Sequence, residues 1–152
     1  MLKLSTKRGL AGDRGQALIE TAITLPLVLF VAVAIFEFGR AYQTIHVINN
    51  AVREGARLAI LPGTKAEDVQ ARVTGYLRNG ALSNVDNATV AVNQNASMSI
   101  GASTAGASVV TVSYPFSFIV LNPVANLVVR GSTVGNAPFS MSASAQMRNE
   151  AQ

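Results

Sequence analysis

The sequence contains no cysteine, a single histidine and few charged residues, and each scarcity removes a class of function. Without cysteine the chain forms no disulfide, thiol nucleophile or cysteine-ligated metal site. The one histidine, His46, has no second histidine or cysteine with which to share a metal ion, and it is the only conventional imidazole base for a serine nucleophile. We therefore expect no enzyme activity, no metal, no cofactor and no small-molecule substrate.

Charged residues make up 13% of the chain, against roughly a quarter of an average soluble domain. Their basic surplus lies at one end: the first fourteen residues carry a net charge of +3 out of a total of +4, from Lys3, Lys7, Arg8 and Arg14 against Asp13. A nucleic-acid interface needs a clustered basic face, which the rest of the chain lacks. A short basic block directly before an apolar run is instead typical of membrane targeting.

Residues 16–36 form that apolar run, in which Glu20 is the only charged residue. As a helix these 21 residues would be about 31 Å long, which just spans a hydrocarbon core of roughly 30 Å. Pro26 lies inside the run, and membrane helices tolerate a proline as a kink. The segment predicts a transmembrane helix preceded by a leader over residues 1–15, which has no helical pattern.

Residues 37–61 continue the helix with a different pattern. An apolar stripe follows steps of three and four, and the other side carries polar residues including His46. We predict one continuous helix from about Gln16 to Leu61, kinked at Pro26 and stopped by Pro62-Gly63. The stripe is made of Phe38, Tyr42, Ile45, Ile48, Val52, Ala56 and Ala59.

Residues 62–152 predict a small C-terminal α+β domain. A capping box at Thr64-Lys65-Ala66-Glu67 would open a short helix that buries Val69, Val73 and Leu77 and ends at Asn79-Gly80. Alternation of period two then predicts four short antiparallel strands, near residues 90–92, 98–100, 110–114 and 140–147. Residues 93–97 and 101–106 are predicted turns. The second has phosphate-loop spacing, but Ala107 stands where that motif needs lysine.

The position of Glu20 suggests a role beyond completing the helix dipole at an interface. It is the fifth residue after Gly15, so a cut between Gly15 and Gln16 would create an ammonium group about 6 Å away along the helix axis. In neighbouring chains staggered by that rise, the ammonium of one would meet Glu20 of the next. Such a buried pair would fix the axial register while cancelling both charges.

These residues resemble a class III signal peptide, and residues 14–60 are similar to the TadE-like family of minor pilins or pseudopilins of the tight-adherence (Flp) pilus system. The major Flp pilin is much shorter and follows its glutamate with tyrosine, whereas Thr21 stands here, which favours a minor subunit. TadG-like proteins share a similar N-terminal segment. The choice between a TadE-like and a TadG-like protein therefore stays open. The matching pieces are Arg14-Gly15-Gln16-Ala17, Glu20, Leu25-Pro26, Phe38-Gly39-Arg40, Ala51-Val52-Arg53-Glu54-Gly55-Ala56-Arg57 and the closing strand at residues 142–150.

The resemblance implies a pilin-like fold, in which a long N-terminal helix packs on a small antiparallel sheet. It also implies cleavage between Gly15 and Gln16 by a prepilin peptidase. The protein would lie in the inner membrane with its C-terminal domain outside the cytoplasm, and its partners would be other pilin subunits and the assembly platform. Pro26 and Arg40 belong to the shared motifs and are candidate helix or subunit contacts.

Five further residues are candidate contacts. Gly39 and Gly55 each cost about 1 kcal/mol relative to alanine inside a helix, a cost that close helix approach would explain. Glu54 and Arg57 are one turn apart, and the simpler interpretation is a surface ion pair worth a few tenths of a kcal/mol. The alternative is a contact with a neighbouring subunit, in which Arg53 would join them.

Two other functions remain open from the residues. The chain could be a secreted binding module, because Ala32-Val33-Ala34 offers an ordinary signal-peptidase site. It could also be an uncleaved single-pass anchor that presents the sheet domain for adhesion. Glu20 is awkward for the secreted module, and a cut after Ala34 would divide a helix whose pattern continues.

Overall fold

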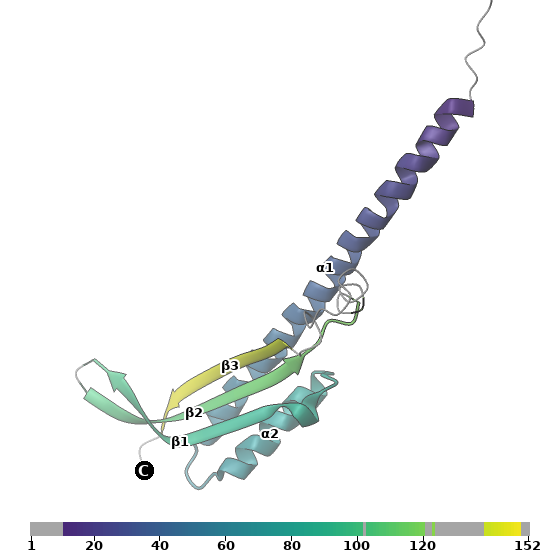
Figure 1. The fold of residues 1–152 in the computed structure, drawn as a ribbon. Helices are drawn as coiled ribbons and strands as arrows, with labels where there is room; N and C mark the ends of the chain where they lie inside the picture. The colour runs from purple at the N-terminus through teal and green to yellow at the C-terminus, as the bar shows by residue number, and fades with distance from the viewer. Residues whose placement is uncertain (1–10, 102, 121–122, 124–138, 150–152) are drawn as a thin grey trace, which may run out of the picture. The chain divides into compact units, whose positions relative to one another are not determined.

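The computed structural model describes residues 11–101, 103–120, 123 and 139–149, with the side chains of residues 11–14 and 100 excepted. In chain order the elements are α1 (Ala11–Ala59), α2 (Ala66–Asn79), the short 3₁₀ helix η1 (Val85–Asn87), β1 (Thr89–Ile100), β2 (Ser103–Phe116) and β3 (Phe139–Arg148) (Figure 1). The chain divides into two units, Met1–Phe36 and Glu37–Gln152, each with its own internal contacts. The combination of a long helix and an antiparallel sheet confirms the predicted α+β, pilin-like class.

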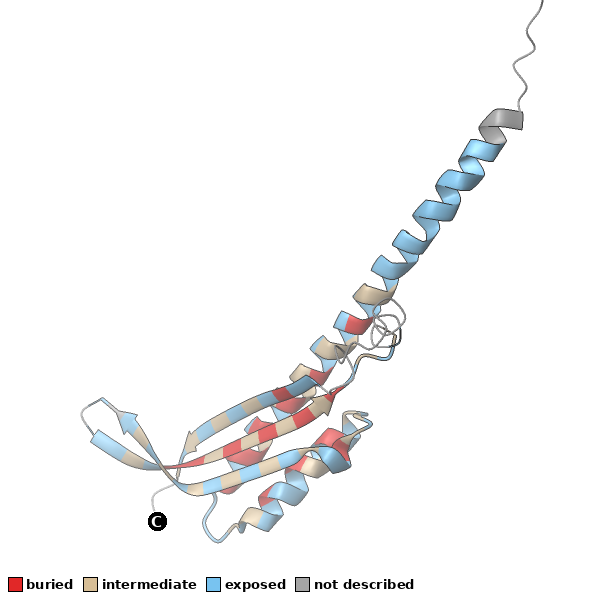
Figure 2. Ribbon diagram, viewed as in Figure 1, coloured by how far each residue is buried: buried red, intermediate tan, exposed pale blue. Residues whose placement is uncertain are grey.

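In the first unit, α1 runs from Ala11 through the whole apolar stretch with Pro26 inside it. The helix therefore begins before the predicted start at about Gln16, and it includes residues 11–15 of the predicted leader. Once a helix has nucleated, each further residue adds a hydrogen bond at little cost, so the apolar helix extends back into the flanking sequence. Figure 2 shows that this part of α1 is exposed along its described side chains up to residue 32.

In the second unit, the part of α1 from Glu37 onward and all of α2 cover one face of the sheet. The helix residues Ile48, Val52 and Ala56 share one core with residues of α2 and with the inward side chains of β2. The α2 contribution is Val69, Val73 and Leu77, which are fully buried as predicted. The β2 contribution is Val110, Val112, Tyr114 and Phe116.

The predicted apolar stripe of α1 is right at its distal end and wrong at its start. Ile48, Val52, Ala56 and Ala59 are buried, but Phe38 and Tyr42 are 63% and 67% exposed. The buried positions at this end of the helix belong to Glu37 and Thr44. The buried face of the helix differs from the predicted one here because Glu37 and Thr44 form hydrogen bonds inside the protein, Glu37 with Arg40 and Val120 and Thr44 with the Arg40 carbonyl. The spacing of apolar residues in the sequence does not predict such bonds.

The start of α2 lies one residue later than the predicted capping box. Lys65 is the N-cap, and its backbone N–H donates to Asp68 Oδ2 at 3.3 Å, so Asp68 takes the role predicted for Glu67. The helix ends at Asn79 as expected, and the N–H of Gly80 donates to the carbonyl of Tyr76.

The sheet has three antiparallel strands in the order β1-β2-β3, rather than four short ones. The predicted turn at residues 93–97 is an irregularity within β1, where the register with β2 shifts between Asn93 and Ala96. The predicted turn at residues 101–106 is wrong from Ser103 onward, because β2 begins there. Gly101 has a positive φ of 61°, which suits the short connection. Most of the region predicted to be irregular, residues 115–138, lies outside the described residues, although Pro115 and Phe116 belong to β2.

Side chains of the sheet form hydrogen bonds with a backbone carbonyl at the C-terminal end of α1. The last carbonyls of a helix have no partner within the helix. Here the Ala59 carbonyl accepts from Gln94 Nε2 on β1 and from the buried Ser108 hydroxyl on β2, both at 3.2 Å. Gln94 also donates to the Thr64 carbonyl at 2.9 Å, so one side chain ties the end of α1 to the segment that leads into α2.

Candidate functional site

The predicted processing junction, Gly15–Gln16, lies within the first turns of α1. Gly15 is exposed, and a Cβ placed on it would meet no atom within 4 Å. Only residues 11–14 of the helix precede it, so little helix must open for an extended peptide to form. Glycine costs a helix about 1 kcal/mol relative to alanine, which favours such opening.

Glu20 is exposed on the same helix. In the described part of the chain its carboxylate has no hydrogen bond or ion pair. It lines a shallow groove of about 370 Å³ with Thr21, Thr24 and three apolar residues, Ala17, Leu25 and Val28. The Thr21 hydroxyl donates to the Ala17 carbonyl at 2.8 Å.

The apolar surface around Glu20 is uncovered. Apart from the partly buried Val33, the large apolar side chains from Leu18 to Phe36 are 50% to 72% exposed. Residues 16–36 include twelve Leu, Ile, Val or Phe residues. On insertion scales they favour the bilayer by at most roughly 4–7 kcal/mol in total, against roughly 2.5–3.5 kcal/mol for one central carboxylate. By length and composition this helix can cross a membrane, a criterion that a signal sequence near the N-terminus also meets.

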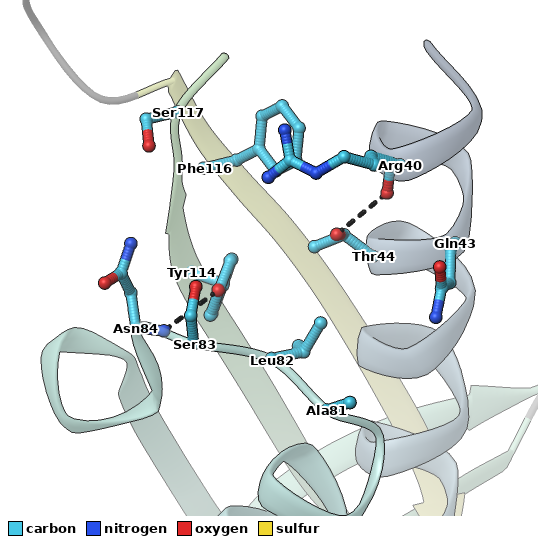
Figure 3. A pocket seen from close by; sticks show the side chains of 10 residues that line it. All are labelled: Arg40, Gln43, Thr44, Ala81, Leu82, Ser83, Asn84, Tyr114, Phe116 and Ser117. Carbon is cyan, nitrogen blue, oxygen red and sulfur yellow. Dashed lines mark hydrogen bonds between the residues drawn. The ribbon is translucent and has the colours of Figure 1, made fainter. Parts of the chain in front are cut away.

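Directly after the apolar run, Glu37 is fully buried. Its Oε2 accepts from Arg40 Nη1 at 2.7 Å, and its Oε1 accepts from the backbone N–H of Val120 at 2.5 Å. The Arg40 guanidinium also lies over the ring of Phe116, 5.2 Å from its centroid (Figure 3). A buried carboxylate is tolerated only when it is paired and hydrogen-bonded, and Glu37 meets both conditions.

Sequence reasoning missed Glu37 and placed Arg40 only as a candidate helix contact. The available signal was a glutamate and an arginine three residues apart at the point where the uncharged run ends. The spacing allows one helical turn to bring the two side chains together. Their burial depends on Phe116 and Val120, which are distant in sequence.

The two glycines that were expected at close contacts behave differently. Gly55 is buried, and a Cβ there would collide with Val73 and come within 3.3 Å of Val110 Cγ1. The approach at Gly55 is therefore to α2 and the sheet of the same chain. Gly39 is exposed, and a Cβ there would meet nothing within 4 Å.

Glu54 forms ion pairs with two arginines, Arg57 and Arg72. It accepts from Arg72 Nη2 of α2 at 2.8 Å and lies 3.6 Å from Arg57 Nε. The hydrogen bond from Arg72 lowers the pKa of Glu54 below its ordinary value of 4.5, and the charges of Arg57 and Arg72 act in the same direction. The predicted Glu54–Arg57 pair is present, with Arg72 as the stronger partner. Arg53 is exposed.

The structure therefore separates the candidate residues into groups. Gly15, Gln16, Glu20 and Pro26 lie on the uncovered helix of the first unit. In the second unit Arg40 is held by Glu37, and Glu54, Arg57 and Arg72 form a surface network. His46 is exposed, with its ring 4.2 Å from that of Tyr42.

Comparison with known proteins bears on candidate residues of both units. No curated protein and no solved structure matches the chain. A family model described as "TadE-like protein" matches residues 15–57, which include the processing junction, Glu20, the apolar run, Arg40 and the Arg53–Arg57 motif. Over these residues, which form most of its long N-terminal helix, the chain is similar to the TadE-like protein family.

Proposed function

We propose that the protein is a minor pilin or pseudopilin of a tight-adherence pilus system. A prepilin peptidase cuts it between Gly15 and Gln16, and it assembles through its N-terminal helix. The observation that carries the proposal is Glu20, which has no partner among the described residues and lies on an exposed apolar helix, five residues after Gly15 and within the TadE-like segment. The role is structural and not catalytic.

The uncovered helix is the part that a membrane or other subunits would cover. Before assembly, residues 16–36 lie in the inner membrane, and the basic leader, residues 1–15, stays on the cytoplasmic side. Residues 37–61 form the amphipathic half of the stem, and residues 62–152 form the C-terminal domain outside the cytoplasm. In an assembly, neighbouring helices from other pilin subunits replace the lipid.

Glu20 supplies the register in this proposal. In the described residues it has no partner, and an unpaired carboxylate among packed apolar helices would be strongly unfavourable. Cleavage after Gly15 creates a cation of the right charge about 6 Å along the helix. The new ammonium of one subunit can therefore neutralise Glu20 of the next, which sets the stagger between them.

The first test is the N-terminal residue of the mature protein recovered from its native membrane. Gln16 supports the proposal. Ile35 as the first residue would instead indicate a secreted module, and Met1 an uncleaved anchor. In a strain that processes the wild type, Gly15→Ala is expected to leave the precursor at full length, and normal maturation of this variant would count against a prepilin peptidase.

The second test concerns assembly. Glu20→Ala is expected to insert into the membrane normally but to co-purify poorly with pilus components. Thr21→Ala is the matched control, because Thr21 lines the same groove and its hydroxyl is already bonded to Ala17. Equal co-purification of the two variants would remove the register argument.

A further inference from the structure

A small polar cavity lies beside Arg40 in the second unit, with a volume of about 90 Å³. Figure 3 shows its walls: Arg40 and Gln43 come from α1, Ser83 and Asn84 from the segment after α2, and Tyr114 and Ser117 from β2 and the residue just beyond its end. The space is that of a few water molecules, enough for the oxygens of one small polar group.

The chemistry of the walls favours an anion. Arg40 is the one cation among the described residues that line the cavity, and no acidic residue is among them. The guanidinium uses Nη1 for Glu37 and rests its face on Phe116. Arginine carries five N–H donors in a fixed fork, so donors remain for a second acceptor. Side chains of Gln43, Ser83 and Ser117 can add neutral donors.

Arg40 is held in place before any ligand arrives. The bond to Glu37 and the contact with Phe116 fix the guanidinium, while the side chain stays 29% exposed. A fixed donor loses less conformational entropy on binding than a free arginine does. Because Glu37 offsets part of the charge, directed hydrogen bonds provide much of the attraction to the phosphate oxygens. The described lining residues include no acidic side chain to hold a cationic headgroup such as choline, which favours an anionic lipid.

The position of Arg40 in the chain indicates which anion is available. It follows Phe36, the last residue of the apolar run, by four residues, or about 6 Å along a helix. The polar headgroup layer on each side of a bilayer is roughly 5–8 Å thick. Phe36, Phe38 and Tyr42, which surround Arg40 in sequence, are 61% to 67% exposed, and aromatic residues gather at this depth in membrane proteins.

We propose that this cavity binds the phosphate group of a phospholipid headgroup through Arg40, with preference for an anionic lipid such as phosphatidylglycerol. The inference rests on the part of the proposed function that places residues 16–36 in the membrane. Binding would hold the second unit against the lipid surface while the subunit waits in the membrane before assembly.

The test uses the mature full chain in bilayers of equal parts phosphatidylcholine and phosphatidylglycerol. After gentle detergent extraction, native mass spectrometry counts the lipids that the protein retains. We expect the wild type to retain phosphatidylglycerol in preference to phosphatidylcholine. Gln43→Glu, which adds a carboxylate to the cavity wall and leaves the Glu37–Arg40 bond intact, should reduce that retention about tenfold.

Two further variants distinguish a loss of lipid binding at the cavity from a loss of folding and from the loss of any one positive charge. Arg40→Gln should lose phosphatidylglycerol retention to the same extent. Because this change also removes the partner of Glu37, its result is interpreted together with that of the single variant Gln43→Glu. Arg53→Gln is the control, because Arg53 is an exposed arginine of the same helix that does not line the cavity. It should retain as much phosphatidylglycerol as the wild type.

Equal retention by the wild type and Gln43→Glu would overturn the proposal. A second arm titrates the lipid-free protein with inorganic phosphate. Displacement of phosphatidylglycerol by phosphate supports a phosphate site, whereas phosphate binding without any preference for phosphatidylglycerol would refute the headgroup as its source. A protein that begins at Gln16 in the membrane but shows no lipid preference overturns this inference alone. A protein that is absent from the membrane overturns the proposed function as well.

Discussion

Replacement of Gly55 by alanine tests the packing of the second unit at its tightest point. Gly55 lies where α1 meets both α2 and the sheet, and it has no room for a methyl group. A Cβ would collide with Val73, approach Val110 Cγ1 to 3.3 Å and lie 3.6 Å from Val69 Cγ1. Valine in a helix has essentially one side-chain rotamer, so Val73 cannot turn away and the helices must move instead.

Two opposing effects decide the magnitude. Alanine is favoured over glycine in a helix by about 1 kcal/mol. Overpacking a well-packed core costs typically about 1–3 kcal/mol, and contact with three valines argues for the upper part of that range. We therefore expect Gly55→Ala to reduce the free energy of unfolding by about 1–2 kcal/mol, or very roughly 4–8 °C in melting temperature.

Gly39→Ala is the matched control on the same helix. Among the described residues no atom lies within 4 Å of a Cβ placed at Gly39, so we expect only the helix propensity to change. This variant should be more stable than the wild type by up to about 1 kcal/mol. We therefore predict that Gly55→Ala lowers the free energy of unfolding and that Gly39→Ala raises it.

Thermal unfolding followed by near-ultraviolet circular dichroism of the full chain in detergent measures both variants. The chain has three tyrosines and no tryptophan, and all of the tyrosines lie in the second unit, so the signal reports that unit. A Gly55→Ala protein as stable as Gly39→Ala would refute the close approach. Val73→Ala should partly rescue Gly55→Ala, so that the double variant loses about 1 kcal/mol less than the sum of the two single changes.

Two predictions concern carboxylates of the second unit. Glu37→Gln removes the charge that Arg40 pairs with, and because Arg40 is partly exposed we expect a loss of about 1–3 kcal/mol in the same unfolding assay; an unchanged melting temperature would contradict the buried pair. For Glu54, the hydrogen bond from Arg72 lowers the pKa in the folded state, so its stabilising effect is present above the ordinary value of 4.5 and is lost as the pH falls below it. Stability of the wild type should therefore fall more steeply than that of Glu54→Gln between about pH 5 and pH 3, by a small amount because the pair lies at the surface, and parallel curves would refute it.

Local patterns were sufficient to predict the helices. The apolar run and the period of the following residues predicted one continuous helix, and its distal contacts at Ile48 and Val52 were right. The three buried residues of α2 were also right, since a short amphipathic helix has only one apolar side to bury. These features depend on neighbours within one or two turns.

The sheet was predicted less well because its strands are defined by pairing. Residues 93–97 contain asparagine and serine and look like a turn, but pairing with β2 resumes at Ala96 after a shift in register. Residues 103–106 are small and polar, yet they pair with residues 97–100 of β1. Pairing partners are chosen across the chain, so residue composition alone does not determine where one strand ends.

The contrast between Glu20 and Glu37 shows what the structure adds to the sequence. Glu20 lies inside the apolar run, near its start, and Glu37 directly follows its end. Glu37 is buried and fully bonded by Arg40 and Val120 of its own chain, whereas Glu20 is exposed and unpartnered among the described residues. A change at Glu37 should therefore act on the folding of one subunit. A carboxylate with no partner among the described residues of its own chain gains stability from a group supplied by another subunit, and for this reason a change at Glu20 should act on assembly.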